Sequence, residues 1–224
     1  MAGEARSGDA VVVRHDGDVH LLAVVDALGH GDLAADVADA AVAVLHDVDL
    51  GAPPSQWMEH LHVHLRGSRG AAATAVRVHG RVVEGCGVGN VELRSSNGGV
   101  SAMLSPGVLG HQVAAFRPFA GSLGDGERLL LFSDGLSRRV RLQDVAHLAP
   151  PAAVRKVVDA FGQAHDDQSA LLAAFAASTG ATTSSSPTAT SRTPLSRTQQ
   201  ALADIRRRKT AHIDVDVDVV GETS

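Results

Sequence analysis

The chain has 224 residues, of which 44% are hydrophobic and 20% are charged, a composition typical of one globular domain with an appendage and too small for two full domains. Its longest apolar runs, such as residues 21–25 and 129–132, are far too short to cross a membrane, and its first residues lack the pattern of a secretory signal, so we expect a cytoplasmic protein without membrane contact. The formal net charge of -5 argues against nucleic acid as the main partner, because phosphate backbones attract clustered Lys and Arg.

The predicted elements alternate between hairpins and helices along the chain. Strands at 11–13 and 20–25 flank Asp16-Gly17, which is a strong hairpin signal. Apolar residues then recur with a helical period over residues 34–45. The remaining predicted elements are a helix at 55–65, strands at 72–78, 81–88, 91–94, 100–104 and 128–133, a helix at 152–164 and a strand at 168–175. This order favours antiparallel sheets covered by helices over a parallel βαβ fold.

A change of composition marks the end of the folded part. In residues 178–194, 11 of 17 residues are Ser or Thr, which predicts a flexible linker. We therefore expect a folded domain over residues 1–177, a linker over 178–194, and a mostly disordered tail over 195–224. An alternative remains for residues 213–220, where apolar residues alternate with Asp: this segment would suit a strand added to an exposed sheet edge.

The single cysteine, Cys86, limits the possible chemistry. One thiol excludes a disulfide framework and a thiolate-rich zinc site, both of which need several sulfur atoms at defined spacing. We expect Cys86 to be a core residue.

Aspartates stand at the ends of several predicted strands. The apolar strand at 21–25 is followed by Asp26, and the strand at 128–133 by Asp134. Asp9 precedes the first strand, and Asp166-Asp167 precede the last. Because an unpaired buried carboxylate is costly, these positions indicate a hard cation such as Mg²⁺ or Mn²⁺. Each aspartate alone would also suit a turn or a cap, and that interpretation stays open.

Six short motifs follow one another in an order that is typical of one family. They are Gly8-Asp9, Val24-Val25-Asp26-Ala27-Leu28-Gly29-His30-Gly31, Arg69-Gly70-Ala71-Ala72-Ala73-Thr74, Gly87-Val88-Gly89-Asn90, Phe132-Ser133-Asp134-Gly135-Leu136 and Asp166-Asp167-Gln168-Ser169. Together they resemble the PP2C-like serine/threonine phosphatases, most of all the small SpoIIE-type branch with its RsbX-like stressosome phosphatases. The resemblance covers roughly residues 8–176. It implies an α+β fold, a PP2C-like sandwich of two antiparallel β-sheets flanked by helices, with two Mn²⁺ or Mg²⁺ ions at one end.

The resemblance also implies roles for individual residues. Asp26 would bridge both metal ions, Asp134 and Asp166 would ligate one of them, and Asp9 would support the metals directly or through water. Ala27 stands where the family usually has Gly, and its backbone carbonyl would be a further ligand. That role requires a suitable backbone conformation, since a positive φ costs a non-glycine residue about 1 kcal/mol.

Two basic side chains near these aspartates have alternative interpretations. His30 would either donate a proton to the leaving seryl oxygen or cap the turn before the following helix. Arg6 would either meet charge on the phosphoryl group or be a solvated terminal arginine. The resemblance also implies that Asp26 and Asp134 belong to the catalytic centre and that water is the nucleophile.

The sequence therefore predicts a metal-dependent serine/threonine protein phosphatase that acts on a regulatory protein. By resemblance, its partner would be a phosphorylated STAS-type antagonist or a stressosome scaffold protein in a partner-switching pathway that controls a stress sigma factor. The alternative is a phosphatase-like binding module that sequesters its partner without turnover. Retention of Asp26, Asp134 and Asp166 argues against this alternative.

Overall fold

The computed structural model describes residues 6–162, 167–175 and 215–222. The strands of the described chain are β1 (Asp9–Asp16), β2 (Val19–Ala27), β3 (Ala71–His79), β4 (Val82–Val88), β5 (Glu92–Ser95), β6 (Gly107–Val108), β7 (Gln112–Val113), β8 (Pro118–Ser122), β9 (Arg128–Phe132), β10 (Gln168–Phe175) and β11 (Val215–Glu222). The helices are α1 (Asp32–Asp47), α2 (Pro54–His64), α3 (Pro150–Phe161) and the short 3₁₀ helix η1 (Leu142–Val145). Among the described residues, none of these helices is long and apolar enough to span a membrane.

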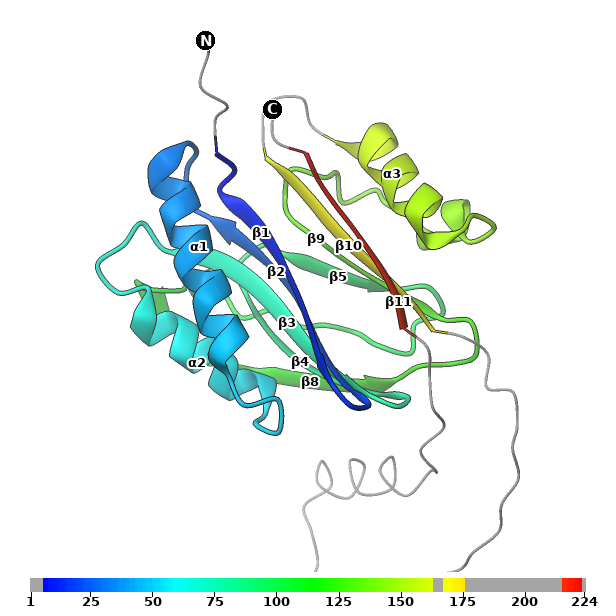
Figure 1. Ribbon diagram of the computed structural model, residues 1–224, viewed down its shortest axis with the longest axis horizontal. Coiled ribbons are helices and arrows are strands. Elements are labelled where there is room, and N and C mark those ends of the chain that lie inside the picture. The colour runs from blue at the N-terminus through cyan, green and yellow to red at the C-terminus, as the bar shows by residue number, and fades with distance from the viewer. Residues whose placement is uncertain (1–5, 163–166, 176–214, 223–224) are drawn as a thin grey trace, which may run out of the picture.

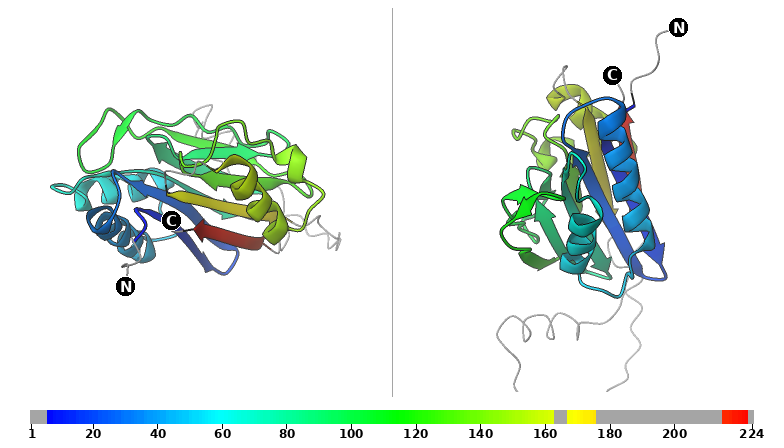
Figure 2. Two further views of the ribbon diagram at one scale, coloured as in Figure 1. Left: turned by 90° about the horizontal axis from the view of Figure 1, so that it is seen from above. Right: turned by 90° about the vertical axis from the view of Figure 1, so that its left-hand side faces the viewer.

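Two antiparallel sheets pack face to face, and helices cover their outer faces (Figures 1 and 2). The first sheet has the strand order β1-β2-β3-β4-β8, and α1 and α2 lie on its outer face. The second has the order β11-β10-β9-β5, with α3 outside it, and β6 and β7 form a separate small hairpin. This confirms the predicted α+β sandwich of two antiparallel sheets flanked by helices.

The alternation of side chains along β2 explains why this strand lies between two layers. Leu21, Ala23 and Val25 pack on the helix side, whereas Leu22 and Val24 pack between the sheets. Successive side chains of a strand point to opposite faces, so an uninterrupted apolar run is what a strand buried on both sides requires. The strand β9 follows the same rule, with alternate leucines facing the two sides.

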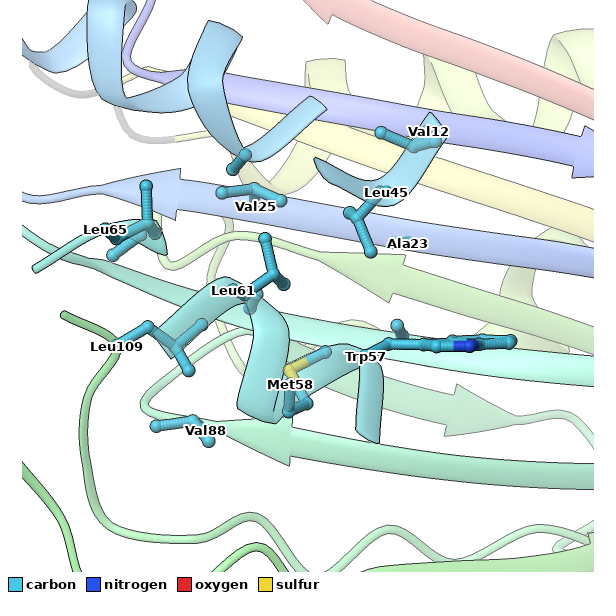
Figure 3. Packing of buried hydrophobic residues seen from close by; sticks show 14 of the residues in the cluster. Val12, Ala23, Val25, Leu45, Trp57, Met58, Leu61, Leu65, Val88 and Leu109 are labelled. Carbon is cyan, nitrogen blue, oxygen red and sulfur yellow. The ribbon is translucent and has the colours of Figure 1, made fainter. Parts of the chain in front are cut away.

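The helix side of the first sheet forms a tightly packed core. Figure 3 shows Trp57, Met58 and Leu61 of α2 and Leu45 of α1 lying over the strands, and all four are at most 1% exposed. Burying such a side chain stabilises a protein by about 2 kcal/mol. The indole Nε1 of Trp57 donates a hydrogen bond to the carbonyl of Asp49 over 2.9 Å, so this buried polar group is satisfied.

One predicted strand is absent from the structure. Residues 100–104 form no strand, although Val100 is buried in the core between the sheets. The edge of β4 is occupied instead by β8, whose Gly121 pairs with Val83 and leaves no space for a side chain next to Gly99 and Val100. Competition between these two segments for one edge was not visible from local sequence pattern.

The last strand decides between the two interpretations of the C-terminal segment. β11 pairs antiparallel with β10 over its whole length, from Val215 opposite Phe175 to Glu222 opposite Gln168. The prediction of a free tail is therefore wrong for residues 215–222, and the alternative of an added strand holds. β10 would otherwise expose a row of unpaired backbone groups at the sheet edge, which a further strand satisfies. The linker at 178–194 and most of the tail lie outside the described residues.

Glu127 is a fully buried carboxylate at the end of the sandwich where β9 begins. It accepts hydrogen bonds from the hydroxyl of Ser95 and from the backbone N–H groups of Gly99 (3.1 Å) and Gly124 (2.6 Å). Burial alone would raise the pKa of Glu127, but these hydrogen bonds together lower it below its ordinary value. The carboxylate thus joins three segments of chain at this end.

We expect Glu127→Gln to lower the free energy of unfolding by about 2 kcal/mol at neutral pH, because an amide cannot accept from all three donors. The lowered pKa means that the stability supplied by Glu127 is complete above its unfolded pKa and is lost as the pH falls through the folded pKa. The difference between wild type and variant should therefore shrink in urea titrations below about pH 4. Asp159→Asn, at an exposed site of α3, is the control and should change the free energy of unfolding little. If Glu127→Gln lowers the free energy of unfolding equally at neutral and at acidic pH, the stabilising role of the Glu127 carboxylate is contradicted.

A chain that ends at Ala177 lacks β11, so the edge of β10 loses its partner. We expect this truncated chain to fold with a lower melting temperature, by about 2–4 °C for every kcal/mol that the strand contributes. Circular dichroism melts of the two chains measure the difference. An unchanged melting temperature would show that β11 does not stabilise the domain.

Candidate active site

Two aspartates of the first sheet lie side by side at one end of the sandwich. Asp9 begins β1 and is the register partner of Asp26, near the end of β2. Paired residues of neighbouring antiparallel strands project to the same face, with Cβ atoms about 5 Å apart. Asp26 shares the face of Leu22 and Val24, which is the face turned toward the second sheet. The side chains of Asp9 and Asp26 are both half-buried.

Two further aspartates come from the second sheet at this end. Asp134 follows β9 after Ser133, and Asp167 precedes β10. The N–H of Ser133 donates to the carbonyl of Ser169 over 3.0 Å, and the carbonyl of Asp167 lies so close to Gly135 that no side chain fits there. The two segments that carry these carboxylates therefore run side by side.

A hydrogen bond connects the two groups across the sandwich. The backbone N–H of Gly8 donates to Oδ2 of Asp167 over 2.6 Å, and the carbonyl of Gly8 accepts from the N–H of Ala27 over 3.0 Å. A Cβ at Gly8 would lie 2.9 Å from the Cβ of Ala34 in α1, which explains why glycine occupies this position. Asp167 thus ties the start of β1 to the second sheet, while Gly8 ties it to the end of β2, beside Asp9 and Asp26.

The loop after β4 positions Asp134. The side-chain amide of Asn90 donates a hydrogen bond to Oδ2 of Asp134. The preceding Gly89 has a φ of +88°, and a Cβ there would lie 2.6 Å from the Cβ of Ala72, the register partner of Asp26. Asn90 belongs to one of the motifs that carry the family resemblance, but the sequence did not reveal its contact with Asp134.

The conformations of Ala27 and His30 bear on their predicted roles. No described non-glycine residue has a positive φ, so the backbone of Ala27, which is 2% exposed, carries no such strain. His30 is exposed just before α1, whose N-cap is Gly31 with no side-chain capping bond. A capping role for His30 is therefore not seen. Its role as a proton donor and the carbonyl of Ala27 as a ligand stay predictions.

Arg69 lies against this loop, although the sequence predicted no role for it. Gly29 has a φ of +91°, and a Cβ there would lie 2.5 Å from Nη1 of Arg69, so the guanidinium rests against the loop that follows Asp26. His111 Nε2 donates to the backbone carbonyl of Arg69 over 2.9 Å. The absence of a side chain at Gly29 leaves room for Arg69, and the motif that begins at Arg69 did not reveal this approach.

Arg6 has a different environment. Its guanidinium is 2.7 Å from Asp36 and 2.5 Å from Asp39, two exposed carboxylates of α1. The hydrogen bond to Asp36 raises the pKa of Arg6, as does Asp39. Arg6 therefore pairs with α1, which argues against a direct role at the strand ends.

Carboxylates from both sheets lie at this end, and carboxylate oxygens are suitable ligands for a hard divalent cation. Within residues 6–162, 167–175 and 215–222, however, no three His, Cys, Asp or Glu side chains are grouped closely enough to hold an ion as they stand. The predicted ligand Asp166 lies outside the described residues. The ligand set Asp9, Asp26, Ala27, Asp134 and Asp166 therefore stays a prediction.

Cys86 takes no part in this arrangement. It is completely buried on the helix side of the first sheet, and burial raises the pKa of its thiol to about 11. A thiol with such a pKa is protonated at neutral pH and is a poor nucleophile. This agrees with the core role expected from the sequence.

Comparison with solved structures found clear relatives, although no protein-family model and no curated protein matches the chain. One relative comes from work on the bacterial stressosome, described as a modular system adapted to control secondary messenger signalling. It is 30% identical, with a TM-score of 0.68, and the match covers 76% of this chain and 92% of that one. RsbX in complex with magnesium is 19% identical (TM-score 0.65; 76% and 88% covered). The catalytic domain of the serine/threonine phosphatase PstP with two manganese ions is 17% identical (TM-score 0.53; 69% and 84% covered).

Proposed function

Because the chain belongs to the PP2C-like family of serine/threonine phosphatases and is related to RsbX, we propose that it is a metal-dependent phosphatase of phosphoserine or phosphothreonine in a regulatory protein. The observation that carries this proposal is that carboxylates from both sheets lie at the same end of the sandwich. Asp9 and Asp26 of the first sheet lie at the same end as Asp134 and Asp167 of the second.

The cofactor in this proposal is a pair of Mn²⁺ or Mg²⁺ ions. Asp26 would bridge them, Asp134 and Asp166 would ligate one of them, and Asp9 and the carbonyl of Ala27 would complete the protein ligands. When bound, such ions act as Lewis acids that make water a nucleophile at neutral pH.

Side chains of the protein would bind the phosphoryl group, orient a metal ligand and donate a proton. Arg69 would bind the phosphoryl oxygens, since a guanidinium matches phosphate geometry and stabilises the charge of the transferring group. Asn90 would hold Asp134 in orientation through their hydrogen bond. His30, exposed at the edge of the same loop as Gly29, would donate a proton to the leaving seryl oxygen.

The substrate in this proposal is a phosphorylated STAS-type antagonist or a stressosome scaffold protein, in a cytoplasmic partner-switching pathway that governs a stress sigma factor. Support comes from the stressosome relative, which is 30% identical to this chain, and from the fold shared with RsbX. A soluble phosphoprotein also suits a chain of net charge -5 better than nucleic acid does.

A second candidate is a phosphatase-like binding module that holds its partner without turnover. One observation favours it: no three metal-binding side chains are grouped in the described part of the chain. The two candidates differ in whether the protein hydrolyses a phosphoester at all, and that difference is directly measurable.

We expect the protein to hydrolyse p-nitrophenyl phosphate with Mn²⁺ or Mg²⁺ and to lose this activity when a chelator is added. Asp26→Asn should lower kcat/KM by roughly a hundredfold to a thousandfold, because a bridging carboxylate supports several kcal/mol of charge stabilisation. Asp134→Asn should behave similarly, and Asp159→Asn on α3 should remain active. If the wild-type protein, folded and supplied with metal, shows no hydrolysis, the binding module becomes the function.

Arg69→Gln should lower kcat/KM for the same substrate by about tenfold to a hundredfold, since a charge-assisted contact to the phosphoryl group is lost. The exposed Arg66→Gln is the matched control, because it removes one positive charge from the same loop region. Arg69→Lys should recover part of the activity. Full activity of a folded Arg69→Gln protein would exclude this role.

A further inference from the structure

A groove lined by arginines begins at Asp134 and extends away from the strand ends. One cavity of about 850 Å³ is lined by Asp134, Ser137, Arg138, Arg139 and Phe161 among others. A second cavity of about 630 Å³ is lined by Arg94, Arg138, Arg139, Arg141 and Phe161 among others. Because the two share Arg138, Arg139 and Phe161, they form one continuous surface, which we call the arginine groove.

The floor of the arginine groove is fastened to α3. Leu136 and Val140 are buried beneath it, at 1% and 5% exposure, and they anchor the segment that carries the arginines. The N–H of Ser137 donates to the carbonyl of Phe161, the last residue of α3, over 2.8 Å. The guanidinium groups therefore project from a backbone that is held by both the core and a helix.

Glu92 organises two of the arginines. Its Oε1 lies 2.8 Å from Nε of Arg138, and its Oε2 lies 2.5 Å from Nη2 of Arg94. One carboxylate thus serves two guanidinium groups, so this trio keeps a net positive charge. The side chain of Glu92 is only 16% exposed, whereas those of Arg94 and Arg138 are 43% and 71% exposed and remain open to a ligand.

Arg139 and Arg141 add further positive charge. Both are exposed, and neither pairs with a carboxylate among the residues that the structure describes. The carboxylates lining the groove are Asp134, which bonds with Asn90, and Asp144. The groove is therefore locally basic in a chain whose net charge is -5.

We infer that the arginine groove binds an acidic segment flanking the phosphorylated residue of the protein substrate. This inference rests on the proposed phosphatase function and adds the chemistry that the substrate must have. A phosphoserine near Asp134 would place its neighbouring residues along Arg138 and Arg139, and Asp or Glu side chains there would pair with the exposed guanidinium groups. The net charge of -5 disfavours unspecific binding of such a segment to the rest of the chain.

Binding of peptides without phosphate tests the groove independently of catalysis. A fluorescein-labelled peptide with Asp and Glu on both sides of a serine is titrated with the metal-free protein, and anisotropy is recorded. The reference peptide carries Asn and Gln at the same positions. We expect the acidic peptide to bind at least about tenfold more tightly, and to weaken as salt rises, because exposed charges are screened.

Variants locate the binding surface. Arg139→Glu/Arg141→Glu should weaken the acidic peptide by about tenfold or more, and Arg139→Gln/Arg141→Gln should do so to a smaller extent. Arg66→Glu/Arg155→Glu is the matched control, because it reverses two exposed arginines that line neither cavity, and it should bind like the wild type. Melting temperatures confirm that each variant is folded. Equal weakening in the control would overturn the inference, as would no weakening in folded groove variants.

Two further measurements separate the possible outcomes. With metal present, kcat/KM of the wild type for an acidic phosphopeptide should exceed that for its neutral counterpart, whereas p-nitrophenyl phosphate reports only on the proposed function. Failure to hydrolyse either class contradicts the phosphatase, while the anisotropy result still decides the groove. A single-stranded oligonucleotide of equal charge should compete poorly with the acidic peptide. If it competes better, the groove binds nucleic acid and the inference is wrong.

Discussion

The burial of the central strands on both faces is the constraint on which the molecule depends. β2 and β9 lie between a helix layer and the opposite sheet, so their central residues, 21–25 and 129–132, are all apolar. The charged residues of these two strands, Asp26 and Arg128, stand near the strand ends. Layer packing alone therefore requires that Asp26, Asp134 and Glu127 stand at or next to strand ends, whatever their chemical role.

The two sheets meet at the candidate active site through backbone contacts as much as through side chains. Gly8, Gly89 and Gly135 each lie where a Cβ would collide with a neighbouring segment. Their close approach lets Asp167 reach the N–H of Gly8 and lets Asn90 reach Asp134. The opposite end of the sandwich is closed by Glu127 in a similar way, with a buried carboxylate that gathers donors from three segments.

Local pattern was enough to predict most strands, the main helices and the carboxylates at strand ends, because periodicity reports directly on which faces are buried. It failed where distant segments compete or approach. Residues 100–104 are apolar enough for a strand, but β8 occupies the edge they would need. Arg69 lies beside the loop after Asp26 because Gly29 has no side chain there, and this approach between distant residues is not visible in a single sequence. The alternation in residues 213–220 suited an edge strand, yet the pairing with β10 required knowing which edge was open.

The pairing of β11 with β10 has a consequence for the end of the sandwich that carries Asp167 and Gly8. Glu222 of β11 lies opposite Gln168, the residue next to Asp167, so the last rung of this ladder adjoins the carboxylate that binds Gly8. The strand β11 thus pairs with the residue that follows Asp167, and Asp167 in turn binds the residue that precedes β1. By thermodynamic linkage, if docking of β11 strengthens the binding of a ligand beside Asp167, that ligand favours the docked strand by the same free energy.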